Sequence, residues 1–439
     1  MTKAGGAAAA IALAAALFLG GTLLPGRGSQ PSAATKSVDA ETLLAPGQSA
    51  DLDQTLATLQ NQIEEGGPKL AEQQASLAIG YLQKARVEAE PSFYDEAEAA
   101  IQASFEAQPD GNFSATIARA ILAGSRHDFH GQVRWGQRAV AINRFNSQAH
   151  GIVGDGYLEL GQEDKAFESY QRSIDLRPDL SSFGRLSAAA QTVGDTRGAI
   201  DAMERALGFA GTSKENAAWA HWQLGELFIG NQQFETAEGH LDQALTLAPD
   251  FNPAVESTVH LTAARGDIKG AIVIMEPLVE DYPLPGNSNF LGELYLLAGD
   301  EAAAASAFKE ADRRLRLYEE HDVRPDVDFA TFWSDRGIHL DRALQVARKL
   351  YSQRTSAAAS DALAWALYAN GRYSDATPYA REAIRRSVND AGYHYHAGMI
   401  ARELGHEAEA RGYLKTALDL DPSWSIIESH RARNVLSSL

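Results

Sequence analysis

Cysteine is absent from this 439-residue chain, and the absence removes several classes of function at once. Without thiols the protein has no disulfide, no thiolate metal site, no cysteine nucleophile and no lipid-modified cysteine. Positive charge is also scarce, because 58 acidic residues against 39 Lys and Arg give a formal net charge of −19. Nucleic-acid binding requires a basic surface, so we expect no nucleic-acid partner.

Sequence signatures of common enzymes are missing too. The chain contains no Walker-type phosphate loop, no G-x-S-x-G elbow and no H-E-x-x-H. His394 and His396 are two apart, so on a helix they point to different faces, whereas His127 and His130 share a face but lack a third ligand. We therefore expect no enzyme activity, no cofactor and no metal. A metal-dependent enzyme that uses these histidines is kept as an alternative.

The amino terminus carries the longest apolar run. Lys3 precedes an Ala- and Leu-rich run over residues 7–19, which extends to Leu24 and ends at Pro25. Its length fits either the apolar core of a signal peptide or a short membrane span. Residues 1–24 thus predict a cleaved signal peptide or a single-pass membrane anchor. Both predict an extracytoplasmic protein, membrane-anchored or periplasmic or secreted.

Two segments separate this run from the body of the chain. Residues 25–50 are rich in Pro, Gly, Ser and Ala, which is typical of a flexible linker. Residues 51–68 place Leu52, Leu56, Leu59 and Ile63 on one face of a short helix. We expect that helix to cover the open end of whatever follows.

Residues 147–180 predict two short amphipathic helices joined by a tight turn. Gly154 permits a close approach, Gly161 ends the first helix, Ala166 and Tyr170 mark the inner face of the second, and Pro178 ends it. This pattern resembles the tetratricopeptide repeat (TPR), which has a period of 34 residues. The same small residue recurs close to this period along the chain, at Ala166, Ala199, Ala237, Ala271, Ala304, Ala343, Ala376 and Ala410.

The resemblance covers residues 69–424 and implies an all-α fold. We expect a right-handed α-solenoid of about ten TPR-like helix-turn-helix repeats, with a polar insertion at residues 313–327 and a C-terminal capping helix within residues 425–439. The runs 332–337, 361–368 and 395–398 look like a sub-type found in bacterial TPR proteins, which indicates no activity.

The family binds its partners in a concave groove lined by the first helix of each repeat. The positions that match the family's groove positions are Asp155, Glu159, Trp222, Glu226, Glu256, His260, Asn289, Glu293, Asp328, Phe332, Asp335, Asp361, Trp365, Tyr368, Tyr395, Met399 and Arg402. Most are carboxylates or aromatics. Aromatic side chains dominate binding hot spots, and carboxylates pair with Lys or Arg. Alternatively, the aromatics pack between repeats and the acids are merely solvated.

The resemblance therefore predicts a non-enzymatic scaffold or adaptor outside the cytoplasm. Its partners would be proteins that present basic or partly apolar segments, together with a membrane if the N-terminal segment is uncleaved. A peripheral subunit of a secretion or polymer-export machine is a second interpretation of the same pattern.

Overall fold

The computed structural model describes residues 52–354 and 356–439, and these form α-helices without a β-strand, as expected from the sequence. The predicted signal or anchor segment and the linker lie outside the described residues. The helices are α3 (Leu52–Glu65), α4 (Leu70–Val87), α5 (Phe93–Ala107), α6 (Phe113–Ser125), α7 (Phe129–Ile142), α8 (Ser147–Glu159), α9 (Glu163–Leu176), α10 (Leu180–Thr192), α11 (Thr196–Gly208), α12 (Lys214–Gly230), α13 (Phe234–Leu247), α14 (Asn252–Ala264), α15 (Ile268–Asp281), α16 (Pro285–Ala298), α17 (Glu301–Glu320), α18 (Val327–Arg336), α19 (Leu340–Gln353), α20 (Ala357–Ala369), α21 (Tyr373–Arg386), α22 (Ala391–Glu403), α23 (Glu407–Leu420) and α24 (Glu428–Ser438).

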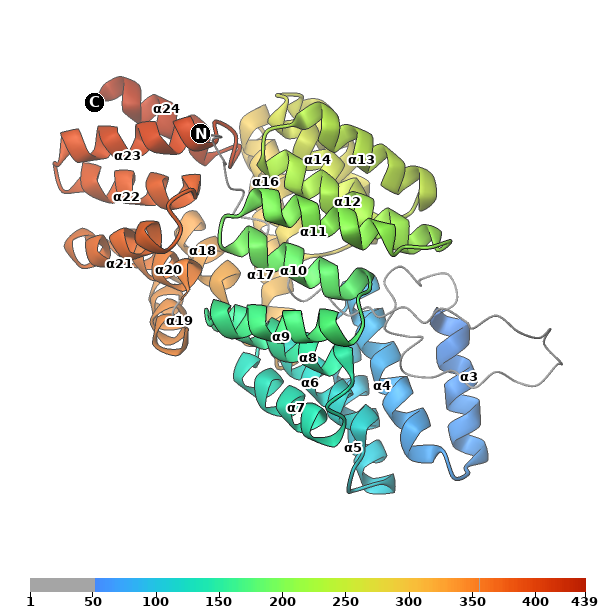
Figure 1. The fold of residues 1–439 in the computed structure, drawn as a ribbon. Coiled ribbons are helices and arrows are strands. Elements are labelled where there is room, and N and C mark those ends of the chain that lie inside the picture. The colour runs from blue at the N-terminus through green and yellow to red at the C-terminus, as the bar shows by residue number, and fades with distance from the viewer. Residues whose placement is uncertain (1–51, 355) are drawn as a thin grey trace.

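Consecutive helices from α4 to α23 pair into ten antiparallel hairpins, which we number 1 (α4–α5) to 10 (α22–α23). Figure 1 shows these hairpins following one another as a solenoid, with α3 beside the first and α24 beside the last. The prediction of an all-α solenoid with about ten repeats is confirmed. None of the described helices is both long and apolar enough to span a bilayer.

Small residues set the close contact inside each hairpin. The eight recurring alanines are at most 1% exposed. At Gly154 an added Cβ would lie 2.4 Å from the ring of Tyr170, and at Gly292 it would lie 2.4 Å from the ring of Phe308. Atoms do not approach this closely, so a larger residue at either glycine would push the two helices apart.

Aspartates begin several of the second helices. Asp128, Asp195 and Asp267 each accept a hydrogen bond from the backbone N–H three residues later, at 2.9–3.0 Å. Each of these N–H groups belongs to a glycine, whose absent Cβ would lie only 2.2–2.3 Å from the capping carboxylate. Some of the acidic residues therefore cap helices. At the N-terminus of a helix, a carboxylate also interacts favourably with the positive end of the helix dipole.

The polar insertion expected at residues 313–327 is mostly helical. Helix α17 continues through it to Glu320, and only residues 321–326 form a loop before α18. Leu315 is 5% exposed and packs with Phe329 and Trp333 of hairpin 8, so the extension adds a buried face to the helix. This longer helix brings the loop 321–326 into contact with hairpin 2.

The solenoid makes more than one turn, and its successive turns touch along contacts that we call seams. In the first seam, Ala89 of the α4–α5 turn packs with Tyr282 of the α15–α16 loop, and the Tyr318 hydroxyl donates a hydrogen bond to the Ala89 carbonyl at 3.4 Å. In the third seam, Arg354, between α19 and α20, pairs with Glu159 at the end of α8 at 3.8 Å.

The second seam is the richest in polar contacts. The backbone N–H of Arg324 donates to the carbonyl of Arg126 at 3.1 Å, and Nε of Arg126 donates to the carbonyl of His321 at 3.1 Å. The side chain of Arg324 reaches Asp128 at 2.9 Å, and His321 lies 2.7 Å from Asp95. The α6–α7 turn is thus held against the α17–α18 loop through both backbone and side chains.

The fourth and fifth seams are lighter. Asn389, in the α21–α22 loop, lies beside Gly194 in the α10–α11 turn, 3.7 Å from where a Cβ would be. Nε2 of Gln232, in the α12–α13 turn, donates to the carbonyl of Leu420 at the end of α23 at 2.9 Å.

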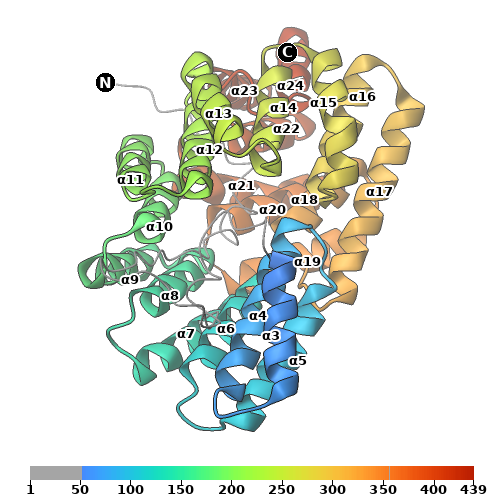
Figure 2. The same ribbon diagram turned by 90° about the vertical axis from the view of Figure 1, so that its right-hand side faces the viewer.

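All five seams obey one rule. At each seam the internal turn of one of hairpins 1 to 5, or the helix end beside it, contacts the end of the hairpin five places further along or the segment that follows it. Tyr318 of hairpin 7 and Asp95 of hairpin 1 extend the first and second seams to a neighbouring hairpin. Figure 2 shows the consequence, with the blue first hairpin beside the orange helices of hairpins 7 and 8. A constant offset requires a nearly constant rotation per hairpin, which is the geometry of a regular superhelix.

Candidate functional site

The predicted groove residues lie on the first helices of their hairpins, but their exposure differs by residue type. Five of the apolar ones are at most 7% exposed and pack between repeats: Trp222, Phe332, Trp365, Tyr395 and Met399. Glu159, Glu226, Glu256, His260, Asn289, Glu293, Asp328 and Tyr368 are partly exposed, whereas Asp335 and Arg402 are exposed. We call the carboxylates Asp155, Glu159, Glu226, Glu256, Glu293, Asp328, Asp335 and Asp361 the acidic inner face.

Buried Asp155 is neutralised by a buried arginine of the next hairpin. Nε of Arg185 lies 3.0 Å from both carboxylate oxygens of Asp155, and the Tyr170 hydroxyl donates to Oδ1 at 3.1 Å. Arg185 is 1% exposed and fills the space that a Cβ on Gly151 would need. Burial raises the pKa of Asp155 to about 6, although Arg185 opposes that rise. This ion pair makes Asp155 a structural element of the hairpin 3–4 junction.

Beside it, one arginine faces three acids. Arg354 forms an ion pair with Asp326, lies 3.8 Å from Glu159 and also acts on Asp328. Burial raises the pKa of Glu159 to about 8 and that of Asp328 to about 7, with Asp326 adding to both effects. The single positive charge of Arg354 does not neutralise the three carboxylates of Asp326, Glu159 and Asp328. The described side chains in this part of the acidic inner face thus include more acids than cations.

Glu226 and Glu256 lie close enough to interact with each other, and no cation of the described residues is among the causes of either pKa shift. Burial raises the pKa of Glu256 to about 8, and Glu226 raises it further. Burial also raises the pKa of Glu226, against a hydrogen bond from Ser257. His260 does not supply a charge, because burial lowers its pKa to about 4. This pair is the least compensated part of the acidic inner face.

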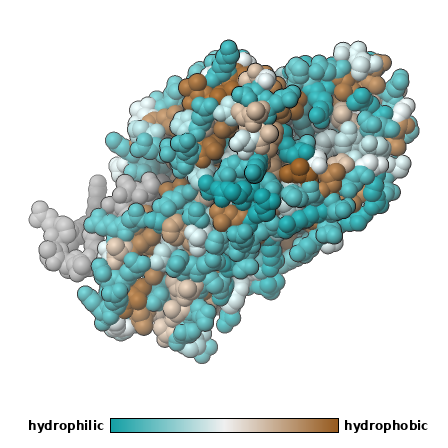
Figure 3. All heavy atoms as spheres, turned by 180° about the vertical axis from the view of Figure 1, so that it is seen from behind, coloured by the Kyte–Doolittle hydropathy of each residue, from teal (hydrophilic) through white to brown (hydrophobic). Residues whose placement is uncertain are grey.

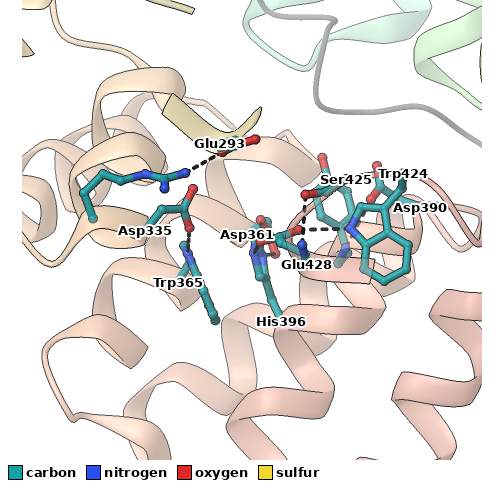
Figure 4. A network of polar contacts seen from close by, with 11 residues as sticks. Glu293, Asp335, Asp361, Trp365, Asp390, His396, Trp424, Ser425 and Glu428 are labelled. Carbon is teal, nitrogen blue, oxygen red and sulfur yellow. Dashed lines mark hydrogen bonds and ion pairs between the residues drawn. The ribbon is translucent and has the colours of Figure 1, made fainter. Parts of the chain in front are cut away.

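The C-terminal end of the acidic inner face holds a network of polar contacts in neighbouring groups (Figure 4). Glu293 pairs with Arg336, and Nε1 of Trp365 donates to Asp335 at 2.6 Å. The Asp335 side chain remains open to solvent although protein surrounds it, and burial with nearby Glu428 raises its pKa to about 6. Asp335 is therefore fixed by one donor yet still free to accept others.

His396 joins three helices at the centre of this network. Its Nδ1 lies 2.8 Å from Asp361 and its Nε2 lies 3.3 Å from Glu428, which also accepts from Trp424 at 2.9 Å. Burial alone would lower the pKa of His396, but Asp361 and Glu428 raise it well above its usual range. An imidazolium held between two carboxylates ties α20, α22 and α24 together.

Three of the four histidines considered as metal ligands, His127, His394 and His396, have other partners. His394 is 8% exposed with its Nε2 3.1 Å from the carbonyl of Val388, while Nδ1 of His127 lies 3.0 Å from the carbonyl of Arg324. Within residues 52–354 and 356–439, no group of three or more metal-ligating side chains is placed to hold an ion.

Sequence reasoning did not anticipate the central roles of Arg185, His396 and Glu428. The recurring small residues identify where helices cross, but they carry no information about which polar side chains meet across hairpins. An Asp and a His at corresponding positions of successive repeats, 35 residues apart as in Asp361 and His396, were the available signal.

Comparison with known proteins finds the repeat in two places. Residues 147–180 and residues 362–423 each match a tetratricopeptide repeat family model. No curated protein matches the chain. Tetratricopeptide repeats generally mediate protein–protein interactions, and the fold typically serves as a non-enzymatic scaffold.

Several solved structures are similar to this chain at low identity. A tetratricopeptide repeat protein from Parabacteroides merdae is 15% identical, with 57% of this chain and 98% of that chain covered and a TM-score of 0.41. The Cut9–Hcn1 hetero-tetramer of the APC/C is 13% identical, with 88% of this chain and 93% of that chain covered and a TM-score of 0.36. The MamA protein is 18% identical, with 47% of this chain and 94% of that chain covered and a TM-score of 0.27. The chain thus carries tetratricopeptide repeats at residues 147–180 and 362–423, within a solenoid of ten helical hairpins.

Proposed function

We propose that this protein is a non-enzymatic scaffold that binds a basic segment of a partner protein on its acidic inner face. The observation that carries the proposal is that, within the described part of the chain, no cation is among the groups that set the pKa values of Glu226 and Glu256. Their raised pKa values mean that burial makes the charged forms costly, and an incoming Lys or Arg would remove that cost. The buried aromatics leave the carboxylates as the groups that select the partner.

The affinity of such a site depends on pH in a defined direction. Near pH 6 Glu256 keeps its proton, whereas above pH 8 it is charged and attracts a basic segment more strongly. Binding at neutral pH should therefore release a proton and strengthen as the pH rises. A groove that recognises its partner through apolar contacts alone would show neither effect.

The test uses a Lys- and Leu-rich peptide with a fluorescent label, titrated with the full chain while its anisotropy is measured. The variant Glu226→Gln/Glu256→Gln should bind at least tenfold more weakly, a loss of about 1.4 kcal/mol. The control Glu235→Gln/Asp242→Asn makes the same kind of change at exposed positions on α13 of hairpin 5, and both variants are compared above pH 8, where Glu256 is charged. Equal losses in both variants would mean that net charge alone attracts the peptide and would refute the site.

The same proposal places the protein outside the cytoplasm. It rests on the apolar run of residues 7–19 between Lys3 and Pro25 in the sequence. Cell fractionation with mass spectrometry of the mature N-terminus tests it. Recovery of the chain from the cytoplasmic fraction with its first residues intact would overturn the location and leave the binding proposal standing.

A further inference from the structure

One surface position on the second helices changes its charge along the solenoid. It lies five residues after each of the eight recurring alanines, and therefore about 140° around the helix from that buried contact. We call these eight positions the outer row and the last four of them its basic half. All eight are exposed: Gln171, Glu204, Asp242, Glu276, Lys309, Arg348, Arg381 and Lys415. Hairpins 3 to 6 thus contribute no cation to the outer row, whereas hairpins 7 to 10 contribute one each.

The helices that carry the outer row differ in the same sense. Helices α9, α11, α13 and α15 hold twelve acids and five cations, whereas α17, α19, α21 and α23 hold eleven acids and twelve cations. The whole chain carries −19. An anionic partner therefore meets less repulsion at the second helices of hairpins 7 to 10 than at those of hairpins 3 to 6.

Two members of the basic half have exposed acids as ion-pair partners. Nη2 of Arg381 lies 2.8 Å from Glu409, and Nζ of Lys415 lies 2.5 Å from Asp419. The other two members form no ion pair with any described residue. Exposed ion pairs are weak because water screens them, so a carboxylate of a partner can compete for all four cations.

The outer row follows a curved path, because the second helices lie on the outside of the superhelix. The first helices α18, α20 and α22 pack on one another, whereas α19 and α21 contact the first helices before and after them. Side chains still bridge adjoining second helices, as from Tyr351 to Glu382 at 2.7 Å. Packed helices lie about 8–10 Å apart, so we expect members of the basic half at intervals of roughly 10 Å.

An extended acidic polypeptide matches the basic half in both spacing and shape. In a polyproline II conformation every third side chain lies on one face, at intervals of about 9 Å. Such a segment follows a curved path, whereas a flat membrane touches an outward-curving row at few points. Figure 3 shows that hydrophilic side chains interrupt the apolar ones on the face opposite to that of Figure 1, which favours recognition through charge there.

We propose that the basic half of the outer row binds an acidic segment of a partner protein, an extended chain with a carboxylate at every third residue. Each carboxylate pairs with the cation of one hairpin, so the segment runs across hairpins 7 to 10. This surface does not depend on the acidic inner face, which selects basic segments. The scaffold thereby holds two partners of opposite charge.

Fluorescence anisotropy tests the spacing, with two labelled peptides of identical composition titrated with the full chain. The first peptide repeats Asp-Ser-Gly four times, and the second has its four Asp residues in succession. Physiological ionic strength is used, because a Debye length of about 8 Å screens the distant acids of the chain. The first peptide should bind at least fivefold more tightly, since only its carboxylates reach all four hairpins. Equal binding of the two peptides, or no binding of the first, would overturn the proposal.

A triple variant locates the site on the chain. Arg348→Gln/Arg381→Gln/Lys415→Gln should weaken binding of the first peptide about tenfold, because three of its four ion pairs are lost. Circular dichroism verifies that the helices are retained. Vesicles of phosphatidylglycerol and phosphatidylcholine test the membrane as the occupant. If the parent bound these vesicles through the same three residues but did not bind the first peptide, the row would belong to a membrane contact and the proposal would fail.

A charge-matched control separates the row from net charge. Arg172→Gln/Arg197→Gln/Lys269→Gln removes two Arg and one Lys from exposed positions on α9, α11 and α15. This variant should bind the first peptide as the parent does. A loss equal to that of the row variant would mean that total charge alone governs the affinity and would refute the site.

Discussion

The second and fifth seams join equivalent parts of the superhelix, yet they differ in chemistry. The second combines backbone hydrogen bonds with side-chain contacts from Arg126, His127 and Asp128. Across the fifth, the described residues form one hydrogen bond, from Gln232 to the carbonyl of Leu420. The geometry of a seam is thus set by the repeat, but its strength is set by individual side chains. We expect the stack of turns to be firmly closed near hairpin 2 and easily opened near hairpin 5.

The strongest test of this difference removes Arg354, which lies where the second and third seams meet. Arg354→Ala would leave Asp326 buried without its ion-pair partner, and losses of about 3–5 kcal/mol are typical of such a change. Urea unfolding measures the loss. Arg348→Ala, at an exposed position of the preceding helix α19, should change stability by less than about 0.5 kcal/mol. A similar small effect at both positions would show that the seams contribute little.

Beside the first seam, Glu256 offers a test that depends on pH. Its pKa of about 8 in the folded chain exceeds the ordinary value of 4.5, so the folded chain retains a proton that the unfolded chain loses. Its stabilising contribution is present below pH 4.5 and is lost as the pH rises through 8. Glu256→Gln should be more stable than the parent by roughly 2 kcal/mol at pH 8.5 and equal to it near pH 5.

Thermal unfolding at both pH values gives this comparison directly. Glu280→Gln, at an exposed position of α15, is the control and should follow the parent at both. If the difference between Glu256→Gln and the parent did not grow with pH, the carboxylate would not carry the raised pKa.

At the second seam the dependence of stability on pH has the opposite sign. Burial lowers the pKa of His127, with Arg354 adding to this and Asp326 and the Arg324 carbonyl opposing it. The unfolded chain therefore takes up a proton first, and stability is lost as the pH falls below about 6.5. His127→Asn should remove part of this acid sensitivity, and Asn tolerates the positive φ of 56° at this position.

Hydrogen exchange of the Arg324 amide, which bonds to Arg126 across the seam, reports the opening locally. Its protection should fall between pH 7 and pH 5.5 in the parent, after correction for intrinsic exchange, and fall less in His127→Asn. His406→Asn at an exposed turn is the control. An identical fall in all three would exclude His127 as the source.

The smallest effect is expected at the fifth seam. Gln232→Ala removes one solvent-exposed hydrogen bond, so the loss of stability should be below about 1 kcal/mol. Faster hydrogen exchange near the end of α23, with exchange in the rest of the chain unchanged, would show that the loss of stability is confined to the fifth seam. Gln233→Ala, next to it and exposed, should leave exchange in α23 as in the parent.

The fold could be predicted from the sequence because the information is local. Gly154 and Ala166 are twelve residues apart, and the contact that they permit recurs near the same period at Gly292 and Ala304. The sequence marked residues 313–327 only as a polar insertion, because polar residues outside the buried face of α17 concealed Leu315 and with it the continuation of the helix.

The seams could not be predicted for a physical reason. Arg126 and His321 are 195 residues apart, and their contact depends on a small rotation per hairpin that accumulates over five hairpins. No local pattern records that rotation. The same holds for Asp155, whose position on the first helix of hairpin 3 was predictable but whose pairing with Arg185 was not. That the residues assigned to the groove bind a partner stays a prediction.

Seams between successive turns also change how the protein would respond to being pulled at its ends. An open solenoid lengthens smoothly, because nothing but the bending of neighbouring hairpins resists the force. Here the contact between Gln232 and Leu420 and the charged cluster around Arg126 would have to release in sequence before any helix unwinds. Such a chain would extend in steps, and the force of each step would be set by the seam contact that breaks in it.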